Sequence, residues 1–226
     1  MIEDIFTTNI NEVIETLLIW WKFNKRNFPW RNTNDSYIIT CVEILLQRTK
    51  AEAVERVYDE FFSSFLNIYH LSTDNSEILK NIIYPLGLPK RVNILRGVAN
   101  YIIETHGGRI PNNESDLLAI PGIGEYTAHA ILSFSYGENY SVFDTNTSRI
   151  VSRIFGVHRA NKTEKKFREV IYSILNKMIE HIGSSVETNY SLLDFAAIIC
   201  RKKKPQCQNC PLSKNCYYNL QVSPNS

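Results

Sequence analysis

Residues 120–148 read IPGIGEYTAHAILSFSYGENYSVFDTNTS, and they form the most informative segment of the chain. The segment opens with a Pro-Gly-Ile-Gly turn at 121–124 and continues as an apolar helical pattern over 125–136. It ends with a lone acid, Asp144. Residues 115–120 also read as a short helix, so the segment predicts a helix, a tight hairpin and a second helix.

The two glycines of this turn indicate a close approach between the backbone and another surface. Gly122 and Gly124 are able to adopt positive φ without a steric penalty. The helix that follows offers unpaired N–H groups and a positive dipole end, and both favour a phosphate. The same pattern is also typical of a plain turn between packed helices, so phosphate binding is one of two interpretations.

The composition is that of a globular protein. With 226 residues and 44% hydrophobic content, the chain is long enough for one large domain or two small ones. The formal charge of +2 gives no global attraction to nucleic acid, so such contacts must come from local clusters. No apolar run reaches the length of a membrane span, and the acidic start MIEDIF lacks a signal pattern. We therefore expect a cytoplasmic protein without membrane contact.

Apolar periodicity predicts several further helices, separated by breaks at 28–31 and 84–91. These helices cover residues 11–23, 36–47, 51–65, 75–83, 93–105 and 165–182.

Four of the five cysteines lie close together: Cys200, Cys207, Cys210 and Cys216, spaced C-x6-C-x2-C-x5-C. In a reducing compartment such a set indicates metal ligation rather than disulfides. Thiolate chemistry alone leaves a structural zinc ion and an iron–sulfur cluster open. The fifth, Cys41, lies in an apolar helical pattern and is expected to be a core residue.

A basic run at 201–204 lies inside the cysteine segment. Such a run is usually a solvated surface. Here two cysteine ligands would hold it rigid, so Lys202 and Lys203 are candidates for phosphate contact.

These segments resemble one known family. The matches are IPGIGEYTAHAIL at 120–132, FDTNTSRIVSR at 143–153 and the cysteine spacing. They are similar to the helix-hairpin-helix DNA glycosylases of the endonuclease III and MutY superfamily, over nearly the whole chain. The resemblance implies an all-α protein with a helical barrel domain at 29–139 and a second domain built from 1–28 and 140–226. It also implies that the four clustered cysteines hold a 4Fe–4S cluster in the second domain.

The resemblance assigns catalytic roles to Glu43, Tyr126 and Asp144. Periodicity alone allows Glu43 to face solvent or to be a buried functional group, but VEILLQRT at 42–49 is similar to the MutY block whose Glu protonates the departing base. Asp144 is by itself a favoured helix N-cap, and the resemblance adds stabilisation of an oxocarbenium-like sugar. Tyr126 replaces the catalytic Lys of strand-cleaving relatives, and is otherwise a helix packing residue.

Further residues are implied to contact DNA. Gln47 and Arg48 match the segment that probes the opened duplex, and MutY has Gln in place of Arg48. The break at 84–91 is by itself an ordinary connector. In the family, however, its apolar residue, here Leu88, enters the gap left by a flipped base. Lys90 and Arg91 would then contact phosphates.

The sequence therefore predicts a DNA glycosylase that acts as a monomer on mismatched double-stranded DNA, associated with the nucleoid of a prokaryote. Arg48 and Leu88, where MutY has Gln and usually Tyr, make the chain more similar to the thymine–guanine mismatch glycosylases of the MutY branch. This resemblance implies release of thymine or uracil opposite guanine, by hydrolysis and without strand cleavage. The chain ends ten residues after Cys216, so we expect no extra C-terminal domain of the MutY type. Release of adenine opposite guanine or oxidised guanine, and a non-catalytic DNA-binding module, are the alternatives.

Overall fold

The structure is a computed structural model that describes residues 8–73, 76–87 and 89–222. Every regular element in these ranges is helical, so the all-α class predicted from the sequence is confirmed. None of the helices described is both long enough and apolar enough to cross a bilayer.

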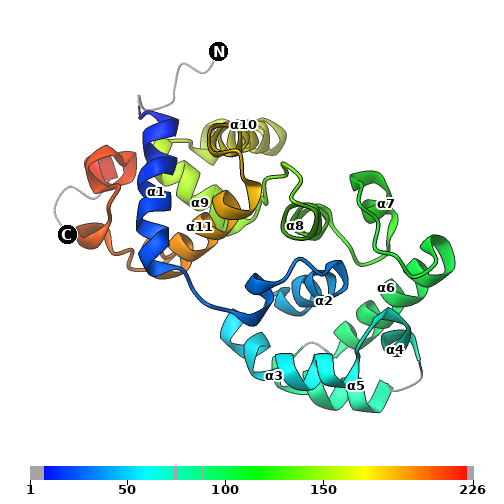
Figure 1. The fold of residues 1–226 in the computed structure, drawn as a ribbon. Helices are drawn as coiled ribbons and strands as arrows, with labels where there is room; N and C mark the ends of the chain where they lie inside the picture. The colour runs from blue at the N-terminus through cyan, green and yellow to red at the C-terminus, as the bar shows by residue number, and fades with distance from the viewer. Residues whose placement is uncertain (1–7, 74–75, 88, 223–226) are drawn as a thin grey trace. The chain divides into compact units, whose positions relative to one another are not determined.

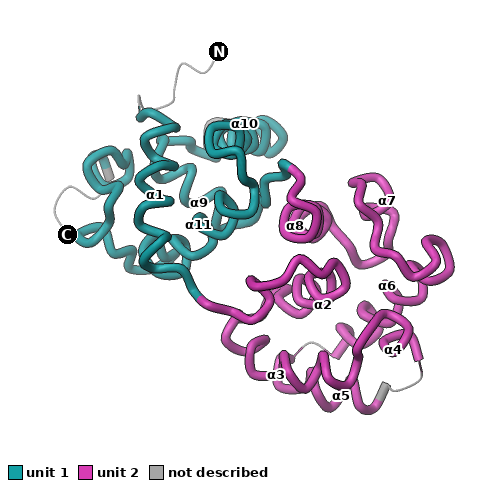
Figure 2. Tube along the Cα trace, in the orientation of Figure 1, with its two compact units in different colours: residues 1–26, 139–226 teal, residues 27–138 magenta. Residues whose placement is uncertain are grey.

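The chain divides into two compact units, which Figure 2 distinguishes by colour. Unit 1 comprises Met1–Arg26 and Asn139–Ser226, whereas unit 2 comprises Asn27–Glu138. Unit 2 is thus an insertion between two halves of unit 1.

Unit 2 is built around helix α8, in which nine of twelve residues are buried. A helix that is apolar or small on most sides forms only inside a core. Helix α8 packs against α2, and the two lie side by side in Figure 1. Short 3-10 helices occupy Pro29–Asn32 and Tyr84–Leu86. The α-helices of unit 2 are α2 (Ser36–Leu46), α3 (Ala51–Ser64), α4 (Ile68–Ser72), α5 (Ser76–Ile83), α6 (Lys90–His106), α7 (Glu114–Ala119) and α8 (Glu125–Tyr136).

Helix α6 begins three residues before the predicted start at 93. Pro89 precedes its first residue, and proline is compatible with a helix start because the first N–H groups need no intrahelical partner. Lys90 and Arg91 therefore lie in the first turn of a helix rather than in an open loop.

Unit 1 has a core shared by helices from both ends of the chain. Val13, Ile14 and Leu17 form one fully buried stripe on α1, which packs against α10 and α11. Burial of each such side chain stabilises the fold by about 2 kcal/mol. The α-helices of unit 1 are α1 (Ile10–Asn24), α9 (Thr145–Phe155), α10 (Glu164–Ile182) and α11 (Ser185–Ile198). Short 3-10 helices at Arg159–Asn161, Cys207–Asn209 and Ser213–Asn215 and a π-helical turn at Tyr218–Val222 complete this unit.

The N-terminal and C-terminal segments are joined by hydrogen bonds. Thr8 Oγ1 donates to the carbonyl of Asn215 at 2.9 Å, and Asn215 Nδ2 donates to Glu12 Oε1 at 2.9 Å. These bonds join the start of α1 to the segment between Cys210 and Cys216.

Helix α11 anchors both connections that leave unit 1. The buried carboxylate of Asp194 accepts hydrogen bonds from Trp21 Nε1 at 2.8 Å and from Arg26 Nε at 2.6 Å. The buried amide of Asn189 accepts from the N–H of Val142 at 3.1 Å and donates to the carbonyl of Tyr140 at 2.8 Å. The segment that leads to Asp144 is therefore fixed before α9 begins.

Candidate functional site

The hairpin between α7 and α8 depends on one glycine for its shape. Gly122 has φ of +99°, which side chains rarely adopt, and a Cβ there would lie 2.9 Å from Ile94 Cγ2. Gly124 is the N-cap of α8 with φ of −97°, and a Cβ there would meet no described atom within 4 Å. The structure thus separates two glycines that the sequence treats alike. Gly124 has no side chain with which to cap the first N–H groups of α8.

The two helices of this hairpin are joined by a hydrogen bond between two side chains. Glu114 Oε1 on α7 lies 2.8 Å from Nε2 of His129, a side chain on α8 that is almost buried. Asn113 caps α7 by accepting the N–H of Asp116 at 3.0 Å. The hydrogen bond between Glu114 and His129 fixes the direction in which the N-terminus of α8 points.

Glu43 and Tyr126 come from the helices α2 and α8, which pack against each other. Glu43 is only 4% exposed and lies in a run of seven buried residues on α2, so it does not face solvent. Burial of such a polar group costs free energy unless the group is paired or functional. Tyr126 is the second residue of α8 and is half-buried.

The turn between α2 and α3 holds a strained residue. Arg48 has φ of +56° and an exposed side chain. This left-handed conformation costs a non-glycine residue about 1–2 kcal/mol. Its neighbours Gln47 and Thr49 donate their N–H groups to Ile44 and Leu46 carbonyls at 3.3 and 3.0 Å, which closes the turn onto α2.

Arg91 is buried, whereas the sequence predicts an exposed side chain that contacts a phosphate. Its side chain is 2% exposed, and Nη2 donates to the Gln47 carbonyl at 2.5 Å and to Thr49 Oγ1 at 2.9 Å. A buried guanidinium that is engaged with its own protein is not presented to a phosphate, so the expected phosphate contact is corrected to an internal one. Lys90 beside it is exposed. Leu88 lies outside the described residues.

Asp144 is the N-cap of α9, as predicted from its residue type and position. Oδ1 accepts the N–H groups of Asn146 and Thr147 at 2.8 Å each, and Oδ2 accepts Asn146 Nδ2 at 2.6 Å. Thr147 Oγ1 in turn accepts the N–H of Asp144 at 3.0 Å, which completes a capping box. The carboxylate therefore has a fixed orientation and several donors.

Polar contacts continue from this acid toward the cysteines. Asn146 Oδ1 accepts from Arg149 Nη1 at 2.9 Å, and Arg149 Nε donates to the carbonyl of Cys200 at 3.0 Å. Burial lowers the pKa of Arg149, while the nearby Cys200 and Asp144 raise it. Asp144 and the cysteine segment thus belong to one network inside unit 1.

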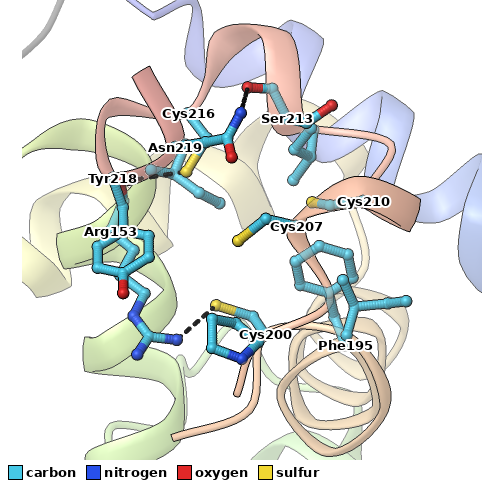
Figure 3. A pocket seen from close by; sticks show the side chains of 13 residues that line it. Arg153, Phe195, Cys200, Cys207, Cys210, Ser213, Cys216, Tyr218 and Asn219 are labelled. Atoms are coloured by element: carbon cyan, nitrogen blue, oxygen red, sulfur yellow. Dashed lines mark hydrogen bonds between the residues drawn. The ribbon is translucent and has the colours of Figure 1, made fainter. Parts of the chain in front are cut away.

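The four clustered cysteines line one pocket. Figure 3 shows the sulfurs of Cys200, Cys207, Cys210 and Cys216 around the same space. Within the described residues, no three His, Cys, Asp or Glu side chains converge closely enough to hold a single metal ion. Four thiols around one space are a donor set that suits a thiolate-bound metal group.

Burial of Cys207, Cys210 and Cys216 favours the protonated form of these three thiols. Burial raises the pKa of Cys210 to about 12 and also raises the pKa values of Cys207 and Cys216. Metal ligation requires thiolates, so binding of a metal group here releases protons.

Arg153 of α9 shapes the loop after Cys200. Its Nη1 donates to the carbonyl of Arg201 at 2.8 Å and lies 3.5 Å from the Cys200 sulfur, while Nη2 donates to the carbonyl of Lys202 at 3.2 Å. The side chains of Lys202 and Lys203 are exposed. The basic run is therefore held by its backbone and open at its side chains.

Three residues of the network between Asp144 and the cysteine segment are not predicted from the sequence: Asn146, Arg149 and Arg153. A signal for them exists, since they follow Asp144 at positions that place them near one face of the first turns of a helix. Arg91 was assigned a surface role because its partners are 42 and 44 residues away in the chain.

A helix, a glycine-bearing hairpin and a second helix, followed by an acid that caps the next helix, define a helix-hairpin-helix protein. The chain is similar to the solved structure of a thermostable thymine-DNA glycosylase, with a TM-score of 0.84 and 30% identity over 93% of this chain and 97% of that one. It shares its fold with endonuclease III in a non-covalent DNA complex, with a TM-score of 0.77 and 20% identity over 96% of this chain and 97% of that one.

Residues 41–177 match the HhH-GPD superfamily of base excision DNA repair proteins, and the chain belongs to that superfamily. A thymine/uracil-DNA glycosylase of Methanothermobacter thermautotrophicus is 36% identical, over 91% of this chain and 92% of the relative. A thymine-DNA glycosylase of Aeropyrum pernix is 35% identical, over 90% and 92%. An adenine DNA glycosylase of Buchnera aphidicola subsp. Baizongia pistaciae is 32% identical, over 89% of this chain and 57% of the relative.

Proposed function

We propose that this protein is a DNA glycosylase that removes thymine or uracil mispaired with guanine. The observation that carries the proposal is the carboxylate of Asp144, held by three donors at the N-terminus of α9. Such a fixed negative charge suits a reaction in which positive charge develops on a sugar. The names of the relatives at 35% and 36% identity support the choice of base.

The roles proposed for the two acids are those that the family resemblance implies, and the burial of Glu43 and the fixed carboxylate of Asp144 support them. Glu43, almost excluded from solvent on α2, donates a proton to the departing base. Asp144 stabilises the oxocarbenium-like sugar, and water attacks it. Tyr126 borders the reacting sugar and offers no amine, so the strand stays intact after the base has left.

DNA contacts are assigned to groups from both units. In unit 2, the open N-terminus of α8 at Gly122 and Gly124 accepts a phosphate, as does Lys90. Gln47 and Arg48 probe the opened duplex, and Leu88 enters the gap left by the flipped base. In unit 1, the exposed side chains of the basic run add phosphate contacts. The partner is thus mismatched double-stranded DNA, bound by a single copy of the protein.

Unit 1 is proposed to be an iron–sulfur domain in which Cys200, Cys207, Cys210 and Cys216 hold a 4Fe–4S cluster. The all-thiol donor set around one pocket supports a thiolate-bound metal group, and the similarity of the cysteine spacing to that of the endonuclease III and MutY cluster favours iron–sulfur over zinc. The bound cluster would supply cross-linking of the C-terminal segment. Unit 2 corresponds to the helical barrel. We also propose a prokaryotic protein that works at the nucleoid in the cytoplasm.

Single-turnover assays test the choice of base. Duplexes with one G·T, G·U or oxidised-guanine·A pair are incubated with excess protein, and abasic sites are revealed with alkali. We expect release of thymine and uracil and slower release of adenine. Rapid adenine release without action on G·T would establish the second candidate, adenine removal, which the 32% identical relative favours. Tight binding without any base release would establish a non-catalytic DNA-binding module.

A further inference from the structure

Arg91 is among the largest fully buried side chains of the protein, although it carries a charge. Both of its hydrogen bonds go to one turn: Nη2 donates to the Gln47 carbonyl at 2.5 Å and to Thr49 Oγ1 at 2.9 Å. Nη1 is buried without a hydrogen-bond partner among the described residues, and no carboxylate there pairs with Arg91. A buried cation without a counter-charge is unfavourable in itself, so packing and charge do not explain its presence.

The turn that Arg91 holds is the strained one. Gln47 and Thr49 flank Arg48, whose φ of +56° persists only if its surroundings fix it. The guanidinium of Arg91 donates hydrogen bonds to the residue before Arg48 and to the residue after it. The backbone of Arg48 is thereby held from both sides, although the exposed side chain of Arg48 makes no contribution to the core.

Arg91 also lies next to the second segment assigned to the opened duplex. It is the second residue of α6, directly after the 84–89 connection, and α6 packs against α2 within unit 2. One side chain therefore links the start of α6 to the turn that carries Arg48.

We propose that Arg91 is a positioning residue for mispair recognition, which locks the Gln47–Thr49 turn to the start of α6 so that Arg48 is presented to the opened duplex. This inference rests on the proposed function. It assigns Arg91 no contact with DNA, and its effect on base release passes through Arg48.

A double-mutant cycle on G·U duplexes tests the link between the two arginines. Arg91→Met keeps the apolar stem and removes the donors and the charge; we expect the single-turnover rate to fall on the order of tenfold or more. In an Arg48→Ala background, Arg91→Met should lower the single-turnover rate by less than about twofold more, because the turn then carries no arginine side chain to present to the duplex. Arg91→Lys, which keeps charge and donors, should restore part of the rate. Arg109→Met removes an exposed arginine of unit 2 and is the matched control.

A second readout needs no activity. Trypsin cleaves after Arg48, and the locked turn should resist it; Arg91→Met should be cut there faster at a temperature where both proteins are folded. Thr49→Val deletes one acceptor, and should show the same effects more weakly if Arg91→Met does not fold. Fully additive rate losses, or unchanged cleavage after Arg48, would overturn the inference. If the wild-type protein releases no base from any duplex, the proposed function fails, while the trypsin result still decides whether Arg91 locks the turn.

Discussion

The side-chain amide of Asn146 donates a hydrogen bond to Oδ2 of Asp144 across 2.6 Å, while Oδ1 of the same carboxylate accepts two backbone N–H groups. Both oxygens of Asp144 thus face donors. This pattern suits a carboxylate, which only accepts, and does not suit an amide in its place.

Asp144→Asn is the sharpest test of the charge-stabilising role proposed for Asp144. The change keeps the helix cap but removes the charge and sets an NH2 group against that of Asn146. We expect base release to fall on the order of 100-fold or more because a preorganised charge is lost. The free energy of unfolding should change by about 1 kcal/mol or less, since Asn is also a good N-cap. Single-turnover rates and thermal unfolding measure the two effects. An unchanged rate would leave Asp144 as a helix cap alone.

The two hairpin glycines form a matched pair of variants. Gly122→Ala adds a Cβ at φ of +99° and 2.9 Å from Ile94, so we expect a loss of about 1–3 kcal/mol in the free energy of unfolding. Gly124→Ala meets open space and should cost about 1 kcal/mol or less, yet weaken DNA binding several-fold if a phosphate occupies that space. Denaturant unfolding and a DNA titration separate the effects. Normal DNA affinity for Gly124→Ala would remove the phosphate from this helix end.

Replacement of one clustered cysteine tests the metal group. Cys207→Ser should lower the iron content and make the C-terminal segment more sensitive to protease, because the ligands close a loop with little core of its own. Cys41→Ala is the control, since Cys41 is buried in α2 of the other unit and its predicted core role is confirmed. Iron and zinc are measured in protein purified without air. Stoichiometric zinc and no iron in the wild-type protein would contradict the assignment.

Tyr126 predicts the chemical outcome after base release. A phenol cannot form a Schiff base with the sugar, so the product should be an intact strand that breaks only in alkali or heat. Tyr126→Lys places an amine on the first turn of α8 and should yield some protein–DNA adduct on borohydride reduction. Gel electrophoresis detects both products. An efficient adduct with the wild-type protein would show that another amine acts, and Lys90→Ala would be the next variant to examine.

The local patterns predicted helices better than side-chain partners. Spacing of apolar residues gave α1 within one residue at each end, because one stripe of the helix faces the core. The sequence also predicts Asp144 as a helix N-cap, because capping depends only on the residue type and its position before the helix. Glu43 needed the structure, because periodicity does not say which side of a mostly apolar helix meets solvent.

Other features depend on contacts that no local pattern contains. Arg91 looked like a surface cation beside a loop, and only the packing of α6 against α2 turns it inward. The difference between the hairpin glycines likewise depends on Ile94, which approaches Gly122 and not Gly124. The sequence pattern predicts that this helix starts at residue 93, because Pro89 is typical of a chain break. Proline is also compatible with a helix start, and α6 begins at Lys90.

The insertion of unit 2 into unit 1 has a consequence for synthesis. Helix α1 leaves the ribosome early, but its partners α10 and α11 follow only roughly 140 residues later, on the order of ten seconds at typical translation rates. Throughout that delay the stripe of Val13, Ile14 and Leu17 has no core to enter. All of unit 2 emerges in the meantime. The nascent chain therefore carries an amphipathic helix whose apolar stripe stays uncovered until α10 and α11 have been synthesised.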